Sequence, residues 1–71
     1  MNAMTIRLNG KDQTVDAGCT VAGLLTGLGI DPGRRGVAVA VNGALVPRRT
    51  WADAVVPEAG EVEVVQPLQG G

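Results

Sequence analysis

The chain has 71 residues, of which 45% are hydrophobic, and its formal net charge is −1 at pH 7. This length predicts one domain, because so short a chain buries only about 60% of the surface that its unfolded form exposes and leaves little room for an enclosed active site. The balanced charge argues against nucleic-acid binding, the absence of histidine removes the commonest metal ligand, and one cysteine forms neither an internal disulfide nor a zinc site.

The first predicted element is a hairpin. Met4 to Leu8 alternate apolar and polar side chains, which is the period of a half-buried strand. Asn9-Gly10 follows, and both residues tolerate the positive φ of a type I′ turn. The return strand, Lys11 to Ala17, has only two apolar residues, so we expect it at a sheet edge. Met1 to Ala3 are interpreted as a leader, with Met4 as the alternative native start.

A helix is predicted after Thr20, whose hydroxyl can cap the first turn. Four apolar side chains then recur at helical spacing and form one stripe suited to packing on a sheet: Val21, Leu24, Leu25 and Leu28. Gly29 suits the left-handed residue that follows a helix, and Pro32 prevents its continuation. Asp31 to Gly36 are predicted to form a loop.

A second hairpin is predicted around Asn42-Gly43. Its first strand, Val37 to Val41, is apolar throughout, which indicates a strand that is covered on both faces or partly in contact with a partner. Its second strand, Ala44 to Val46, ends at Pro47, which has no amide donor.

One short helical turn and one strand complete the pattern. The turn is expected at Trp51 to Asp53, with Trp51 covering the base of the sheet. The last strand is Glu61 to Val65, with Val62 and Val64 on one face. Pro67 then frees the remaining residues from strand pairing.

This order of elements predicts an α+β fold. If each hairpin pairs its own strands, the first and last strands meet side by side in the centre of the sheet, in parallel and covered by the helix. The fold class is therefore a β-grasp roll with a mixed sheet of four to five strands and one main helix. Residues 1–67 form the single domain, and residues 68–71 form a flexible Gly-Gly tail.

The tail, Leu68-Gln69-Gly70-Gly71, carries the functional hypothesis. Glycine has no Cβ, so a Gly-Gly end can extend through a slot too narrow for any other residue. Chance alone places two glycines at the end of roughly one chain in 200, so the pair by itself does not exclude a frayed terminus. We predict that the terminal carboxylate of Gly71 is the working group and that the rest of the chain presents it.

Several segments together resemble the ubiquitin-like ThiS family of sulfur carriers in thiamine biosynthesis. The resemblance covers Met4 to Gly71 and rests on Val41-Asn42-Gly43, Leu45-Val46-Pro47-Arg48 with Trp51, Glu61 to Val65, and Gly70-Gly71. The chain departs from the family pattern at Pro67, at Gln69 and in a slightly longer loop at Asp31 to Gly36.

The resemblance implies that the chain is a carrier and not an enzyme. A ThiF-type adenylyltransferase, related to ubiquitin-activating enzymes, would use MgATP to adenylate Gly71, while the chain itself binds no cofactor. A cysteine-derived persulfide would then displace AMP and leave a thiocarboxylate, whose sulfur passes to a ThiG-type thiazole synthase. Leu68, Gln69 and Gly70 would thread into the partner enzymes.

Other side chains are given lesser roles. Cys19 is interpreted as a small buried hydrophobe and not as a sulfur relay. Arg48 and Arg49 are assigned to a solvated loop, ahead of pairing with acidic groups on a partner. Docking is expected on the sheet face opposite the helix, and the pattern leaves open whether Val37, Val39, Val41 or Val65 lies there.

Three alternatives remain open. One is a carrier of the molybdopterin-synthase small-subunit type, a group that tends to be longer and richer in phenylalanine. The second is a β-grasp regulatory or ligand-binding module with an incidental Gly-Gly end, and the third is a modifier that forms isopeptide bonds. No apolar run approaches the ~20 residues that span a membrane, so we expect no membrane partner. The balanced charge likewise predicts no nucleic-acid partner. Because one cysteine forms no internal disulfide, we expect a cytoplasmic location.

Overall fold

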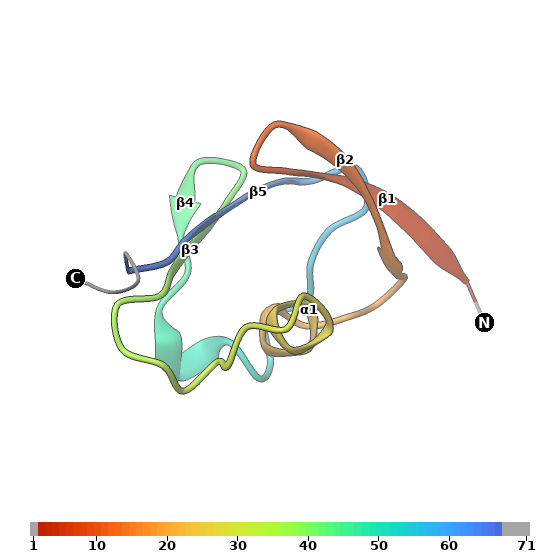
Figure 1. Cartoon of the computed structure of the whole chain (residues 1–71). Helices are drawn as coiled ribbons and strands as arrows, with labels where there is room; N and C mark the ends of the chain where they lie inside the picture. Colours follow the sequence, from red (N-terminus) through yellow and green to blue (C-terminus); the bar gives the residue numbers. More distant parts are fainter. Residues whose placement is uncertain (1, 68–71) are drawn as a thin grey trace.

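The computed structural model describes residues 2–67, which form a five-stranded sheet and one α-helix. The elements are β1 (Ala3–Leu8), β2 (Lys11–Asp16), α1 (Val21–Gly27), β3 (Ala38–Val41), β4 (Ala44–Leu45), the 3₁₀ turn η1 (Arg48–Thr50) and β5 (Glu61–Val65). The strand order is β2-β1-β5-β3-β4, and the sheet arches over α1 (Figure 1). Since β1 and β5 pair in parallel at its centre, the predicted β-grasp roll is confirmed.

The first hairpin forms as predicted. β1 and β2 pair antiparallel around Asn9 and Gly10, whose φ angles of 50° and 83° are those of a type I′ turn, and β2 lies at the sheet edge. The interpretation of residues 1–3 as a leader is wrong for the two that the structure describes. Ala3 lies in β1, and the carbonyl of Asn2 accepts a hydrogen bond from Ala17 N at 2.9 Å.

Helix α1 has the predicted cap and apolar face. The Thr20 hydroxyl accepts a hydrogen bond from Gly23 N at 3.1 Å, and Val21, Leu24 and Leu25 are buried. Gly29, with φ of 80°, lies just beyond the end of the helix. Within residues 2–67, no helix is long and apolar enough to cross a membrane.

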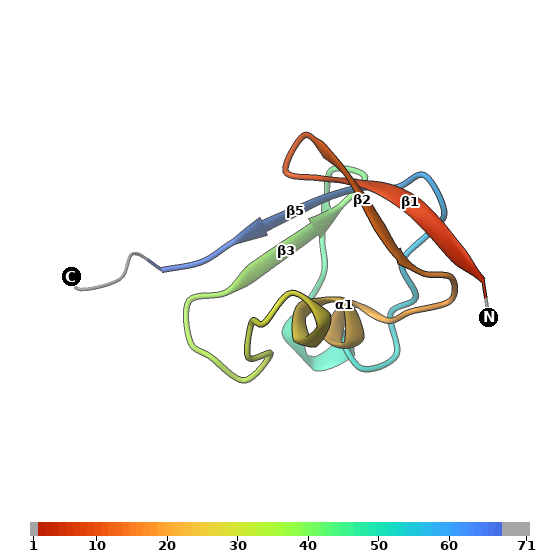
Figure 2. The same cartoon turned by 45° about the vertical axis from the view of Figure 1, so that its right-hand side comes forward.

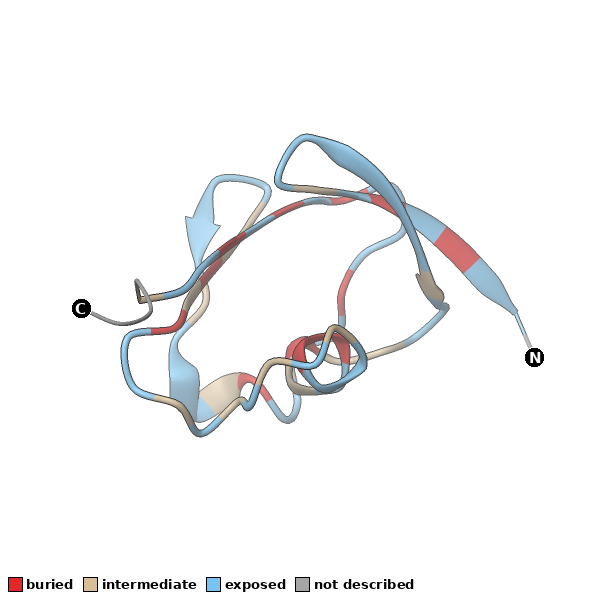
Figure 3. Ribbon diagram, viewed as in Figure 1, coloured by how far each residue is buried: buried red, intermediate tan, exposed pale blue. Residues whose placement is uncertain are grey.

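One hydrophobic core lies between α1 and the sheet (Figure 3). Its members are all less than a tenth exposed: Met4, Ile6, Val21, Leu24, Leu25, Val37, Val39, Trp51, Val56, Val62 and Val64. β1 and β5 alternate buried and exposed residues because successive side chains point to opposite faces of a sheet. The expected burial of Trp51 is confirmed, and its indole Nε1 donates to the carbonyl of Val46 at 2.9 Å.

Two details differ from the sequence-based expectations. The helical segment begins earlier than predicted, with a 3₁₀ helix at Arg48–Thr50, because both the amide and the hydroxyl of Thr50 donate to the carbonyl of Pro47. A hydrogen-bonded turn continues over the predicted residues Trp51 to Asp53, where Ala54 N donates to the carbonyl of Thr50 at 2.8 Å. β3 is not covered on both faces within the described residues: Val39 is buried, whereas Ala38 and Ala40 are half-exposed. The alternative that β3 partly contacts a partner remains a prediction.

Candidate functional site

The strand that leads to the tail is held along both sides. β5 is the middle strand of the sheet, and the two Asn-Gly turns add side-chain hydrogen bonds to its backbone. Asn9 accepts from Val64 N at 2.9 Å and donates to Val64 O at 3.3 Å, while Asn42 Oδ1 accepts from Glu61 N at 2.9 Å. The asparagines of the two turns therefore hydrogen-bond to the backbone near both ends of β5. The sequence predicted the turns but not these hydrogen bonds.

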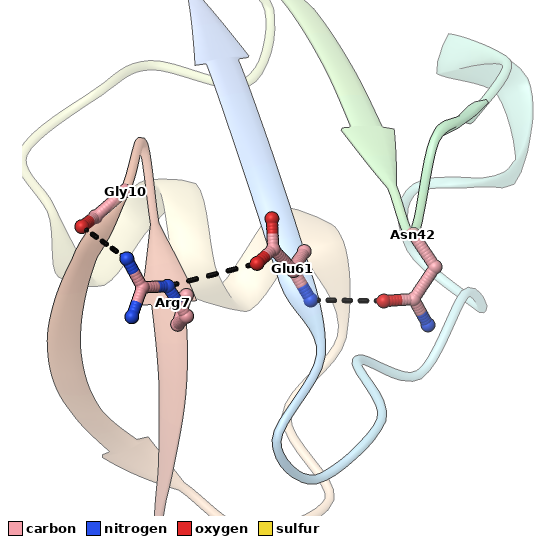
Figure 4. A network of polar contacts seen from close by, with 4 residues as sticks. All are labelled: Arg7, Gly10, Asn42 and Glu61. Carbon is pink, nitrogen blue, oxygen red and sulfur yellow. Dashed lines mark hydrogen bonds and ion pairs between the residues drawn. The ribbon is translucent and has the colours of Figure 1, made fainter.

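A small polar network lies at the start of β5 (Figure 4). The Nε of Arg7 is 3.6 Å from Oε1 of Glu61, and Nη2 of Arg7 donates to the carbonyl of Gly10 at 2.8 Å. Both charged side chains are more than half exposed, so the pair is worth no more than about 1 kcal/mol. Its effect is to orient these side chains on the sheet surface.

Beyond β5 the chain leaves the sheet through Gln66 and the half-buried Pro67. Figure 2 shows β5 running beside β3 toward the C-terminal end, away from the N-terminus. The ring of Pro67 packs on the backbone of Gly36, since a Cβ added to Gly36 would lie 3.2 Å from two of the ring carbons. The predicted site residues Leu68, Gln69, Gly70 and Gly71 lie outside the described residues.

The sheet face turned away from α1 carries an apolar patch. We call it the open-face patch, and it consists of Ala38, Ala40, Leu45 and Val65. Cross-strand pairing brings its members together, because Ala38 pairs with Val65 and Ala40 pairs with Leu45. Leu45 is 72% exposed and Val65 is 60% exposed, so large apolar groups meet solvent next to the point where the chain leaves the sheet.

Of the four valines considered for docking, only Val65 lies on this face. Val37 and Val39 are buried in the core, and Val41 is half-buried opposite Val62. Leu45 was not anticipated, although the two-residue turn at Asn42-Gly43 sets the hairpin register and thereby places Leu45 opposite Ala40.

Acidic side chains border the patch along β5. Glu63 pairs with Ala40 across the sheet, and Glu61 lies two residues earlier on the same face. Both are exposed. A complementary surface would therefore combine an apolar centre with basic groups on the β5 side.

Cys19 lines a cleft between β2 and α1. The cleft has a volume of about 210 Å³ and is lined by Gln13, Thr14, Val15, Asp16, Cys19, Gly23, Leu24, Gly27 and Leu28. Ligand pockets commonly measure ~300–1,000 Å³, so this cleft gives little support to the alternative of a ligand-binding module. No group of His, Cys, Asp and Glu within residues 2–67 is arranged to hold a metal ion.

The thiol of Cys19 is poorly suited to sulfur chemistry. Burial and, to a smaller extent, the carboxylate of Asp16 raise the pKa of the Cys19 thiol above its ordinary value. Because the thiolate is the reactive form, the thiol is a weak nucleophile at neutral pH. Cys19 is half-buried where burial was expected, and it packs against the hydrophobic core as a structural residue would.

Cys19 should react slowly with iodoacetamide. We expect its alkylation at pH 7.5 to be slower than that of glutathione and to accelerate only as pH rises toward its elevated pKa. A Cys19→Ala variant should accept sulfur as the wild type does. Mass spectrometry measures both, and a variant that takes up no sulfur would restore the relay interpretation.

Arg48 and Arg49 differ in the contacts that their side chains make with the rest of the protein. The guanidinium of Arg48 donates to the carbonyls of Pro32, Arg34 and Val37 and lies 4.5 Å from the centre of the Trp51 ring. Its assignment to a solvated loop is therefore incomplete, because the side chain is exposed but bound to the protein. Arg49 on the same 3₁₀ turn is exposed as well.

Comparison with known proteins gives a consistent result. Residues 6–71 match the model of the ThiS family. The sulfur carrier protein ThiS of Escherichia coli is 35% identical over 68 residues, which cover 96% of this chain and 100% of the relative. The crystal structure of the thiamine biosynthesis protein ThiS from Geobacter metallireducens superposes with a TM-score of 0.78 at 30% identity, covering 96% of this chain and 100% of that one.

A longer protein is also similar. A thiazole synthase of Magnetococcus marinus is 44% identical over 68 residues, which are 96% of this chain and 20% of the relative. The chain thus spans about a fifth of the length of that synthase.

Proposed function

The chain belongs to the ThiS family of sulfur carriers in thiamine biosynthesis, and from that premise we propose that it carries sulfur as a thiocarboxylate on Gly71. The carboxylate is first adenylated with MgATP by an enzyme related to ubiquitin-activating enzymes. The outer sulfur of a cysteine-derived persulfide then displaces AMP to form an acyl disulfide, and a thiol reductant cleaves its S–S bond to release the thiocarboxylate. Thiazole synthase receives the sulfur. The setting is the cytoplasm, and the chain is a cosubstrate that its partners act upon.

The chemistry of the carboxyl group supports this sequence of steps. A free carboxylate resists nucleophiles, whereas an acyl-adenylate has a good leaving group. Gly71 has no side chain to obstruct attack, and Gly70 allows the backbone to pass through a narrow channel. Leu68 and Gln69 complete the segment that enters the partner.

One structural observation carries the proposal: the open-face patch includes Val65, the last residue of the strand β5 that precedes the tail in the chain. Val65 lies in the patch, and Pro67 two residues later is where the chain leaves the sheet. Gly71 lies six positions after Val65, a reach of roughly 20 Å when extended. A partner that docks on the patch would thus receive the terminal carboxylate within its own active site.

The existence of longer relatives supports thiazole synthase as the sulfur acceptor. The similar Magnetococcus marinus protein is itself a thiazole synthase, so a segment like this chain occurs within a polypeptide of that name. The adenylyltransferase and the persulfide donor are proposed from the family chemistry alone.

Intact mass tests the proposal. The carrier is incubated with MgATP, the cognate adenylyltransferase and a sulfur source, and the mass should rise by the difference between sulfur and oxygen. Fragmentation should place that rise at Gly71. An unchanged mass with an adenylyltransferase that is active on another carrier would refute the proposal, and attachment to lysines would favour a protein modifier.

A charge in the open-face patch should weaken docking. Leu45→Asp buries a carboxylate in the apolar centre of the proposed interface, so we expect the KM for the carrier in adenylation to rise at least about tenfold, the effect of a typical interface hot spot. The kcat should change little, because docking contacts persist in the transition state.

Val55→Asp is the matched control. Val55 is 61% exposed but bridges to Thr20, outside the patch. Both variants should keep the wild-type melting temperature, since both sites are on the surface. Equal KM values for the two variants would show that the open-face patch is not part of the docking surface.

A further inference from the structure

The side chain of Arg48 hydrogen-bonds to residues that are distant from it in the sequence. Arg48 begins η1, directly after Pro47, and its Nη2 donates to the carbonyls of Arg34 at 2.7 Å and Val37 at 3.2 Å. Its Nη1 donates to the carbonyl of Pro32. The guanidinium thereby binds three carbonyls of the loop 31–37 from two separate nitrogens, whereas a lysine would have to present all its donors from one nitrogen.

The same guanidinium is held from its other side. It lies 4.5 Å from the centre of the ring of Trp51, a distance suited to a cation–π contact. The indole is itself fixed, because it is buried in the core and donates to the carbonyl of Val46. The loop is thus tied through Arg48 to the hydrophobic core.

The loop in turn touches the base of the tail. Gly36 has φ of 85°, and a Cβ at this position would lie 3.2 Å from the Cβ and Cγ of Pro67 and 3.4 Å from its Cδ. The absence of a side chain at Gly36 therefore lets the Pro67 ring lie directly on the loop backbone. Pro67 is half-buried, whereas Gln66 before it is exposed.

We propose that Arg48 is a positioning residue, which sets the direction in which the chain leaves the sheet by holding the loop 31–37 against Pro67. This role rests on the proposed function of Gly71. The terminal carboxylate follows Pro67 by four residues, a span of roughly 14 Å when extended, so the direction of the chain at Pro67 determines the region that the carboxylate can reach.

The inference predicts an effect on the KM for the carrier in adenylation. Without the hydrogen bonds of Arg48, the residues at the base of the tail must be ordered when the partner binds. Ordering the backbone of one residue corresponds to about a tenfold change in an equilibrium constant. Arg48→Met keeps a stem that can contact Trp51 and removes the donors, so its KM should rise about tenfold at unchanged kcat.

Arg49→Met is the matched control, because it removes the same charge from the same 3₁₀ turn. Its KM should stay within about twofold of wild type, as expected for one exposed charge. Arg48→Lys keeps the charge without the fork and should behave like Arg48→Met, which separates geometry from electrostatics. In a Pro67→Ala background, Arg48→Met should add little, because the contact through which it acts is already weakened.

A measurement on the free carrier separates this inference from the proposed function. The backbone order parameter of the Gln66 amide, from ¹⁵N relaxation, should fall from a value typical of rigid backbone, about 0.85, toward about 0.6 in Arg48→Met and Arg48→Lys but not in Arg49→Met. Spectra recorded at the assay temperature establish that each variant is folded. An unchanged order parameter, or a KM equal to that of Arg49→Met, overturns the inference. A wild-type chain that is never adenylated refutes the proposed function while the relaxation result still stands.

Discussion

Deletion of Gly71 should abolish thiocarboxylate formation. The shortened chain still ends in a glycine carboxylate, but one residue or about 3.5 Å short of the position from which the full chain reacts. Since a misplacement of about 1 Å can cost a hundredfold in rate, we expect a loss of more than about a hundredfold in kcat/KM for adenylation. The measurement is AMP or pyrophosphate release with the carrier as the varied substrate, followed by intact mass.

Gln69→Ala serves as the control for this deletion. It alters the tail but keeps its length and both glycines, so at least a tenth of the wild-type kcat/KM should remain. A deletion variant as active as Gln69→Ala would mean that the carboxylate of Gly71 is not the reacting group. The regulatory module with an incidental Gly-Gly end would then become the better explanation.

Truncation of Leu25 should have the largest effect on stability. Leu25 is fully buried, with no exposed surface, between α1 and the sheet. Leu25→Ala should lower the free energy of unfolding by about 2–5 kcal/mol, through lost burial and the cavity left behind. Small domains have only about 5–15 kcal/mol in total, so the variant should be partly unfolded at modest temperatures.

Leu45→Ala is the same substitution at a site that is 72% exposed. Its free energy of unfolding should stay within about 0.5 kcal/mol of wild type. For a domain of this size, 1 kcal/mol corresponds to about 4–8 °C, so thermal melts followed by circular dichroism should separate the two variants by at least about 6 °C. Similar melting temperatures would show that the core is less tightly packed than its burial indicates.

The sheet and the helix could be predicted because their signals are local. The stripe of Val21, Leu24 and Leu25 has helical spacing, and the alternation of β5 buries Val62 and Val64. The two Asn-Gly pairs predicted both hairpins, since few other residues adopt positive φ easily. The tail hypothesis depends on Leu68 to Gly71 and remains a prediction.

The side-chain interactions around β5 and the loop 31–37 were not predictable in the same way. Asn9 bonds to Val64 across 55 positions, and Arg48 reaches carbonyls 11 to 16 positions earlier. No local spacing encodes such contacts, because they arise only when the sheet brings distant segments together. The earlier start of the helical segment, at Arg48–Thr50, also follows from a particular pair of hydrogen bonds to Pro47.

The sequence by itself therefore determined the elements of the β-grasp fold and the candidate reactive terminus, because periodicity, turn residues and the Gly-Gly pair are local properties. Only the tertiary structure decided which apolar side chains stay exposed on the sheet, and it selected Val65 and Leu45 over Val37 and Val39. It also decided that Arg48 is a structural donor, because its acceptors are main-chain carbonyls whose positions depend on the folded loop.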